Sequence, residues 1–369
     1  MKLPNSVSTA SIIQSEAFIA FTLALIAAAL IKIPAIFGIH LDQHENFYLR
    51  NVSLFVLPLL SSYFLWKHNF PARTLALAAV AFITAGVFAN IYPFTERSDT
   101  ETLLALHLPV ALWLFIGITY TGGQWNKTRA RMDFVRFSGE LFIYYVLLAL
   151  GGGALTAFTA LIFGTIGIDI EPFFETWMLP CGSAGTVIIA SWLVESRGSM
   201  TGNLAPLLAR LFTPLFTFML ITFLGIILWS GRSVETDRDM LIAFDIILLV
   251  TLGLLLYCIS ARDTQAPPGV FDVVQVVLVI SALLADAVAL WAISVRIYEF
   301  GFTPNRVAAL GLNLVLLVNL VWSAVQYTRF LRGKGSIRDL ERWQTDYLPV
   351  YSIWAAIVVL LFPPLFGFT

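Results

Sequence analysis

The chain has 369 residues, of which 59% are hydrophobic and only 12% are charged. A soluble globular protein carries roughly 25% charged residues, so this composition excludes an ordinary soluble fold and predicts that lipid covers most of the surface. The formal net charge of -1 provides no global field that would attract nucleic acid. No nucleic-acid-binding motif is present, and nucleic acid is therefore excluded as a partner.

Eleven hydrophobic segments reach or approach the length of about 20 residues that a helix needs to cross the hydrocarbon core. None shows the alternating pattern of a membrane strand, so the predicted fold is all-α, a polytopic bundle of transmembrane helices. The second segment is the shortest, and the long fifth segment is expected to be tilted. The predicted spans are 17–37, 51–66, 73–93, 102–121, 139–167, 177–194, 207–230, 239–260, 271–297, 305–330 and 347–367.

The first span follows a polar run and lacks a small-residue cleavage site, so we expect it to be retained. No stretch outside the spans is long enough for a soluble core, which predicts one membrane-embedded domain over residues 1–369. With eleven spans, 15 of the 22 Lys and Arg residues lie on the side of the N-terminus and the even-numbered loops. Positive residues favour the cytoplasmic side, so the N-terminus is predicted to be cytoplasmic.

The first loop on the predicted outer side contains His40, Asp42, His44 and Glu45. Two histidines four residues apart would share a helix face, and with acids beside them they suit a divalent cation. The loop need not be helical, however, and an acidic, solvated rim is the favoured interpretation.

The fifth and sixth predicted spans contain residues that can interrupt a helix. Discontinuous spans expose backbone groups at which many transporters bind substrate. Small residues spaced four apart also allow two helices to pack closely, and we favour this interpretation. The residues concerned are Gly151, Gly152 and Gly153 in the fifth span and Pro180, Gly182 and Gly185 in the sixth.

Polar residues gather in the eighth, ninth and tenth spans. Asp286 lies midway through the ninth, where a carboxylate costs several kcal/mol unless a partner or water compensates it. Gln275 precedes it by eleven residues and lies about 20° away on a helical wheel, the eighth span adds Asp245, and the tenth adds Asn313 and Asn319. This is the pattern expected of a path for a proton, a cation or a substrate. Interhelical hydrogen bonding is the alternative, and for the amides it is the favoured one.

The segment between the ninth and tenth spans contains Arg296, Glu299, Gly301, Thr303 and Arg306. The glycine allows a turn, and the threonine followed by proline predicts the start of a helix, so the segment is expected to form a tight helix–turn–helix joint in which the glutamate can pair with either arginine. At the predicted outer mouth of the polar path, the arginines could instead contact an anion or a lipid head group.

The run RIYEFGFTPNRV in this segment and the later run YLPVYSIWAAIVVLLFPPLFGF resemble a bacterial family of integral membrane proteins, domain of unknown function 4153. The resemblance covers residues 272–369. It implies that Arg296, Gly301, Thr303 and Arg306 are signature positions, and it implies a multi-pass protein of the bacterial inner membrane. The family carries no activity that could be transferred to this chain.

Ser336 and Asp339 fit a capping box at the start of a helix. The following residues Ile337, Leu340, Trp343 and Tyr347 fall near one face. The pattern predicts an amphipathic helix that lies on the membrane surface, where it could bind anionic lipid or a partner protein. Plain anchoring of the topology is the alternative, and we favour it.

No Walker loop, dinucleotide fingerprint, nucleophile elbow or zinc-protease helix appears, so no cofactor is expected. The two cysteines, Cys181 and Cys258, lie in apolar stretches and are expected to pack as small hydrophobic residues.

The leading hypothesis is a secondary transporter with Asp286 as its protonatable centre, with membrane lipids and an unknown small solute or ion as partners. One alternative is a metal-dependent enzyme acting on lipid or envelope precursors at the outer histidines. The other is a non-catalytic assembly or regulatory protein that uses the helix beginning at Ser336.

Overall fold

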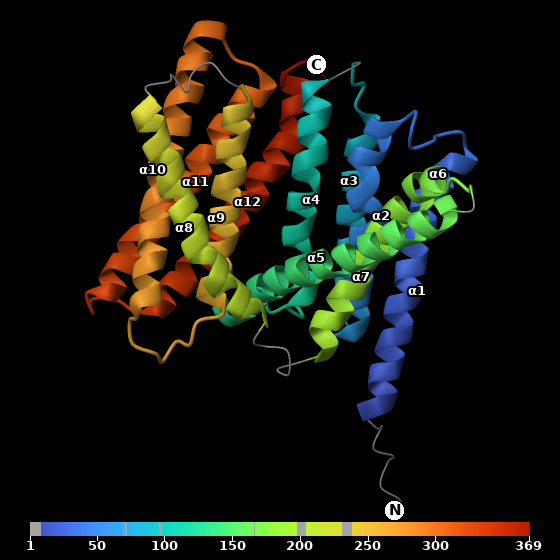
Figure 1. Cartoon of the computed structure of the whole chain (residues 1–369), viewed down its shortest axis with the longest axis horizontal. Coiled ribbons are helices and arrows are strands. Elements are labelled where there is room, and N and C mark those ends of the chain that lie inside the picture. Colours follow the sequence, from blue (N-terminus) through green and yellow to red (C-terminus); the bar gives the residue numbers. More distant parts are fainter. Residues whose placement is uncertain are drawn as a thin grey trace, which may run out of the picture. The chain divides into compact units, whose positions relative to one another are not determined.

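The computed structural model describes residues 9–68, 70, 72–95, 98–165, 167–197, 204–230 and 238–369. Over these ranges the chain consists of helices, turns and loops without a strand, which confirms the predicted all-α fold. The helices (Figure 1) are α1 (Thr9–Ile36), α2 (Glu45–Lys67), α3 (Ala72–Ile91), α4 (Asp99–Tyr120), α5 (Thr128–Thr165), α6 (Glu171–Phe173), the π-helix η1 (Phe174–Met178), α7 (Leu179–Arg197), α8 (Leu204–Ser230), α9 (Arg238–Ser260), α10 (Val270–Phe300), α11 (Pro304–Leu331) and α12 (Ile337–Leu365).

Within the described residues, 11 helical segments are long and apolar enough to cross a membrane. Each corresponds to one predicted span, and α6, η1 and α7 together make the sixth. The second span, short in the sequence prediction, is a helix of 23 residues. The chain is therefore a multi-pass helical membrane protein.

Cα packing divides the chain into two compact units, a finer division than the single domain expected from the sequence. Unit 1 comprises Met1–Asn90, Ile118–Gly123 and Glu140–Thr201. Unit 2 comprises Ile91–Gly117, Gln124–Gly139 and Gly202–Thr369. Helices α3, α4 and α5 each contain residues of both units.

In unit 1, α1, α2 and α7 pack against one another. Ala20, Ala24 and Ala27 form a buried stripe on α1. A Cβ atom at Gly185 of α7 would lie 3.6 Å from the Ala24 carbonyl oxygen, so small residues on both helices allow a close approach. This contact agrees with the packing interpretation for Gly185, whereas no heavy atom of the described chain lies within 4 Å of a Cβ placed on Gly182. The sixth span is irregular at the π-helix η1, which ends at Met178, two residues before Pro180.

The three glycines of the fifth span behave differently. Gly151, Gly152 and Gly153 lie inside the uninterrupted helix α5, so this span is not broken. No heavy atom of the described chain lies within 4 Å of a Cβ placed on any of them, so they do not mediate close packing there.

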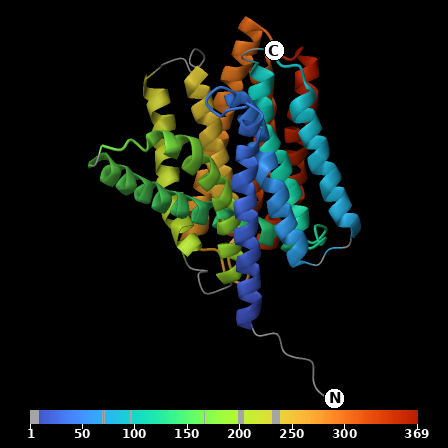
Figure 2. The same cartoon turned by 90° about the vertical axis from the view of Figure 1, so that its right-hand side faces the viewer.

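In unit 2, helices α8 to α12 run alongside one another in both views (Figures 1 and 2). Helix α10 packs against α8, α9 and α11. It can approach these neighbours closely because much of its buried face consists of small residues, namely Ser281, Ala282, Ala285, Ala289 and Ala292. The core around this face is made of leucine, isoleucine and phenylalanine from α8, α9, α11 and α12.

The predicted surface helix at Ser336 is the first part of the long helix α12. The capping box is present, since Ser336 Oγ accepts from the Arg338 amide at 3.2 Å and Asp339 Oδ2 accepts from the Ser336 amide at 2.9 Å. Ile337 and Leu340 are fully buried in the core of unit 2. The prediction that this face lies on lipid is wrong, because the face packs against protein.

Candidate functional site

Asp286 lies near the middle of α10, about 24 Å from its first residue at 1.5 Å per residue. Its side chain is 0% exposed, so it points into the protein and not toward lipid. Both carboxyl oxygens are buried without a hydrogen-bond partner among the described residues. A buried polar group in this condition is unusual, because the great majority are paired.

Asp245 of α9 and Asn313 of α11 complete this site. The Asn313 amide Nδ2 donates to Asp245 Oδ1 at 2.8 Å and to the Ala309 carbonyl at 2.8 Å. Asn313 is 0% exposed, and its own Oδ1 is buried with no partner in the described part of the chain. The carboxyl of Asp245 acts electrostatically on that of Asp286, so the two acids lie near each other. We refer to Asp245, Asp286 and Asn313 as the carboxyl site.

The carboxyl site lacks a basic counter-charge. Among the described residues, no Lys or Arg acts electrostatically on Asp286 or Asp245. Arg296, on the same helix as Asp286, is not among the groups that act on either acid. Two ionised carboxylates in this setting would repel each other and would both be poorly solvated, so the site favours an added positive charge, either a proton or a metal cation.

Asn319 belongs to a separate polar network between α11 and α12. Its Nδ2 donates to Gln344 Oε1 at 3.0 Å, and Gln344 Nε2 donates to Ser323 Oγ at 2.6 Å. All three side chains are fully buried. These side chains are hydrogen-bonded to one another, so Asn319 joins α11 to α12. Interhelical hydrogen bonding is the role that the sequence favoured for the amides.

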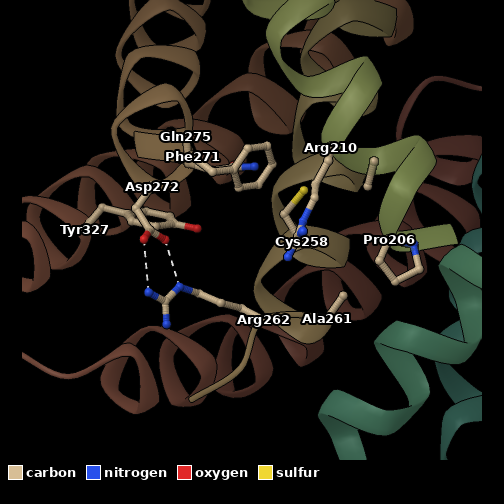
Figure 3. A pocket seen from close by; sticks show the side chains of 10 residues that line it. Pro206, Arg210, Cys258, Ala261, Arg262, Phe271, Asp272, Gln275 and Tyr327 are labelled. Carbon is tan, nitrogen blue, oxygen red and sulfur yellow. Dashed lines mark hydrogen bonds and ion pairs between the residues drawn. The ribbon is translucent and has the colours of Figure 1, made fainter. Parts of the chain in front are cut away.

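Gln275 is also separate from the carboxyl site. It precedes Asp286 by eleven residues, about 16 Å along α10. Its side chain is 1% exposed and lines a cavity with Cys258 of α9 and Tyr327 of α11 (Figure 3). The Gln275 amide faces the Cys258 thiol, but neither of its polar atoms makes a hydrogen bond of standard geometry within the described chain.

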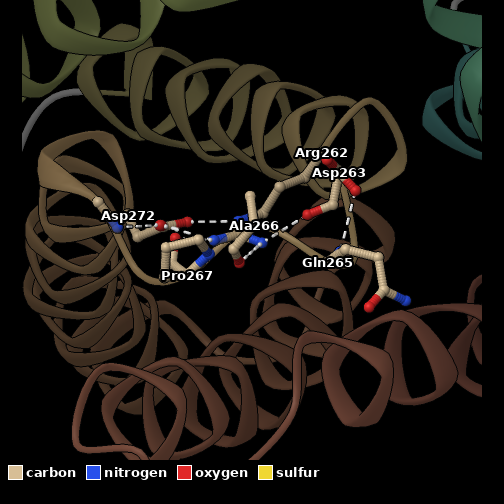
Figure 4. A network of polar contacts seen from close by, with 7 residues as sticks. Arg262, Asp263, Gln265, Ala266, Pro267 and Asp272 are labelled. Carbon is tan, nitrogen blue, oxygen red and sulfur yellow. Dashed lines mark hydrogen bonds and ion pairs between the residues drawn. The ribbon is translucent and has the colours of Figure 1, made fainter.

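Arg262 and Asp272 also line that cavity, and they form an ion pair with each other. Arg262 Nε and Nη2 donate to the two oxygens of Asp272 at 2.8 and 3.0 Å. The remaining guanidinium hydrogens bond the carbonyls of Asp263, Ala266 and Pro267 (Figure 4). The hydrogen bonds that Arg262 donates to Asp272 raise the pKa of Arg262, which keeps the guanidinium charged. This arginine stabilises the α9–α10 loop and has no donor left for a ligand.

The segment between α10 and α11 forms the predicted helix–turn–helix joint. Gly301 has a φ of 77°, and its amide donates to the Ile297 carbonyl at 2.9 Å. Thr303 Oγ1 accepts from the Arg306 amide at 3.4 Å and caps α11. Arg306 donates to the carbonyls of Phe300 and Gly301 at 3.0 and 2.8 Å, so its side chain holds the end of α10.

The two charged residues earlier in this joint make no ion pair in the described chain. Glu299 is exposed and pairs with neither Arg296 nor Arg306. Arg296 is partly buried, and its Nη1 has no hydrogen-bond partner among the described residues. The expected pairing of Glu299 is therefore wrong for this structure, whereas the turn itself is confirmed.

His40, Asp42, His44 and Glu45 are all exposed; the first three precede α2, and Glu45 is its first residue. The described part of the chain contains no group of three or more His, Cys, Asp or Glu side chains arranged to hold a metal ion. The geometry therefore gives no support to the outer metal site.

The sequence analysis did not identify Ser323, Gln344 or Arg210 as site residues. Gln344 lies in the segment that the sequence analysis predicted to lie on the membrane surface, so a buried hydrogen-bond network was not expected there. Arg210 is six residues into α8 and lines the cavity at Gln275. The sequence did contain a signal for Arg210, because it lies inside the predicted span 207–230 and arginines are rare in membrane spans.

Neither a family model, nor a curated protein, nor a solved structure matches the chain. The chemistry of the carboxyl site must therefore be inferred from its own geometry.

Proposed function

We propose that this chain is a secondary-transporter-like protein in which the carboxyl site binds and releases a proton or a monovalent cation. The observation that carries the proposal is Asp286, a fully buried acid in mid-span with two unpaired oxygens and a second acid beside it. The resemblance of residues 272–369 to a bacterial membrane family favours the bacterial inner membrane as its location.

The charge balance of the site supports exchange of a positive charge. Ionisable residues inside a membrane span are rare and commonly mark proton relays or ion pathways. A proton shared by Asp245 and Asp286, or a cation held by their oxygens with the free Asn313 Oδ1, would remove the repulsion between the acids. Oxygen ligands of this type suit a hard cation such as Na⁺.

The two acids differ in depth, which suggests separate tasks. Asp245 is seven residues from the first residue of α9, about 10 Å along the helix, and it is only partly buried. Asp286 is deeper and fully enclosed. In the proposed pathway Asp245 is the entry group and Asp286 is the central binding group.

A purely structural role fits Asp286 less well. A carboxyl group that joined helices would be expected to accept hydrogen bonds, as Asp245 does from Asn313. Asp286 accepts none from the residues that the structure describes. The site is closed around it, so transport requires α9, α10 and α11 to separate on at least one side, as alternating access does.

The test is charge movement in proteoliposomes adsorbed on a solid-supported membrane. Steps in pH, in Na⁺ and in a panel of small solutes are applied, and transient currents are recorded. Wild-type protein should give a current with at least one of these steps, and Asp286→Asn should abolish it, because the amide has nearly the same shape but carries no negative charge and takes up no proton.

The matched control is Gln326→Glu, a change of the same size on α11 at a position outside the carboxyl site. It should keep the current. Membrane abundance and thermal stability of each variant are measured in parallel. A current of wild-type size in Asp286→Asn would refute the proposal, and so would loss of folded protein in that variant alone, which would assign Asp286 a structural role.

A further inference from the structure

The cavity at Gln275 has the chemistry of a site for a phosphate-type anion. It lies between α8, α9, α10 and α11, and it is separate from the carboxyl site. Figure 3 shows Arg210 and Cys258 on one side of the cavity and Asp272 and Tyr327 on the other. We propose that Arg210 and Gln275 bind the phosphate group of an anionic membrane lipid in this cavity.

The side chains that line the cavity carry one positive charge that no acidic side chain among them neutralises. Arg262 and Asp272 are paired through two hydrogen bonds and cancel each other. Arg210 has no ion-pair or hydrogen-bond partner among the described residues, and it lies close enough to act electrostatically on the Cys258 thiol. Its exposed guanidinium is therefore available for a bidentate contact with phosphate oxygens.

Gln275 provides an independent indication of a ligand. It is 1% exposed and lines the cavity, and apart from the Cys258 thiol that its amide faces, neither its Nε2 nor its Oε1 has a hydrogen-bond partner within the described structure. Burial of an amide without partners is unfavourable by about 1–3 kcal/mol. An oxyanion in the cavity would accept a hydrogen bond from the Gln275 Nε2 while it neutralises Arg210.

The size of the cavity favours a head group over a whole solute. Its volume is about 40 Å³, which accommodates two or three water-sized groups. That space suits the oxygens of one phosphate group whose remainder lies outside. Leu207 and Leu211, which flank Arg210 on α8, are 62% and 55% exposed and offer an apolar surface for acyl chains.

The position of the cavity along the helices agrees with a head group. Helix α10 has 31 residues and is about 46 Å long, more than the hydrocarbon thickness of about 30 Å. Gln275 is five residues from its start, and Cys258 is two residues from the end of α9. The ends of these helices therefore extend into the layer where lipid phosphates lie.

The experiment uses the full chain in detergent and in nanodiscs. Native mass spectrometry counts bound phosphatidylglycerol against phosphatidylcholine, and isothermal titration calorimetry measures binding of inorganic phosphate. The variants are Arg210→Gln and Gln275→Leu. Arg338→Gln is the control, because Arg338 is an exposed arginine of the same unit outside the cavity.

Wild-type protein should retain phosphatidylglycerol in preference to phosphatidylcholine, and Arg210→Gln should weaken that retention about tenfold or more, as expected for one charge-assisted contact. Arg338→Gln should leave it unchanged. Binding of inorganic phosphate that depends on Arg210, without lipid retention, would support the anion site and identify a free anion as the ligand.

Equal retention of both lipids together with absent phosphate binding would overturn the proposal. Equal effects of Arg210→Gln and Arg338→Gln would also overturn it. The result is independent of the transport assay, because Arg210→Gln leaves the carboxyl site intact and its pH-driven or Na⁺-driven currents can be measured on the same preparation.

Discussion

Asn313 donates a 2.8 Å hydrogen bond to Asp245 and so joins α11 to α9 beside the buried acid Asp286. The same amide leaves its carbonyl oxygen without a partner among the described residues. The contact therefore both links two helices and leaves an acceptor at the carboxyl site.

The energy of this link can be measured with a double-mutant cycle of Asp245→Asn and Asn313→Ala. Interhelical hydrogen bonds in membranes contribute about 0.5–2 kcal/mol, and we expect a coupling energy in that range between these two positions. Denaturation of the purified protein by a harsh detergent provides the free energies of unfolding. A coupling energy indistinguishable from zero would show that the contact does not join the helices.

The packing of α11 against α12 depends on Gly311. A Cβ atom at this position would overlap the indole ring of Trp354, and the rigid ring cannot move aside without a large energetic cost. Gly311→Ala should destabilise the protein by about 1–3 kcal/mol, as overpacking does. The same assay should show recovery in the double variant Gly311→Ala, Trp354→Leu.

Gly253→Ala is the control for Gly311, because nothing lies within 4 Å of its Cβ position and its φ is not positive. This helical position should tolerate alanine or gain stability slightly. If the two alanine variants are equally stable, the close contact with Trp354 is absent in the protein.

The turn between α10 and α11 requires glycine at position 301. Its φ of 77° and ψ of -178° lie in a region that side chains strongly disfavour. Gly301→Ala should therefore destabilise the protein by about 1–3 kcal/mol even though nothing lies within 4 Å of the new methyl group. The midpoint of thermal unfolding measures the effect, and Gly225→Ala in α8, which also has open space around it, should leave that midpoint nearly unchanged.

His68, just after α2 in unit 1, should make stability depend on pH. Burial lowers the pKa of His68 below its usual 6.5, with smaller opposing and reinforcing effects from Glu195 and Lys67. The unfolded chain then takes up the proton more readily than the folded chain, so this group removes stability as pH falls below about 6.5 and has no such effect above about pH 8.

His68→Gln should therefore reduce the loss of thermal stability between about pH 7 and about pH 5. The unfolding midpoint of wild type and variant is measured across that range. A variant that loses as much stability as wild type would show that His68 is not the titrating group.

Local sequence features predicted the spans and their caps. Hydropathy over about 20 residues is enough to find helices in lipid, and the capping residues Thr303 and Ser336 act within a few residues of themselves. The enclosed position of Asp286 also followed from the sequence, because a carboxyl group in mid-span avoids lipid.

The grouping of the polar residues could not be predicted in the same way. A helical wheel places Gln275 and Asp286 on one face but ignores the roughly 16 Å that separates them along α10. Asn313 and Asn319 lie six residues apart on α11 and point to different neighbours, Asp245 of α9 and Gln344 of α12. Which helices pack together is a tertiary property.

The amphipathic pattern after Ser336 likewise does not show which surface its apolar face contacts. Its period identifies an apolar face, but an apolar face can meet either lipid or protein. In the structure it meets the core of unit 2, where Ile337 and Leu340 are buried.

The central claim, that Asp286 exchanges a proton or a cation, is tested most directly by labelling with dicyclohexylcarbodiimide. This apolar reagent modifies protonated carboxyl groups inside membrane proteins, and peptide mass spectrometry locates the product. Asp272 serves as the internal control, since its ion pair with Arg262 should keep it unmodified.

We expect Asp286 to be modified, with a yield that falls as pH rises, and we expect Na⁺ to protect it if the site binds that cation. Labelling of the Asp286 peptide should disappear in Asp286→Asn. Absence of labelling at both Asp286 and Asp245 across the pH range, in protein that remains folded, would contradict the claim.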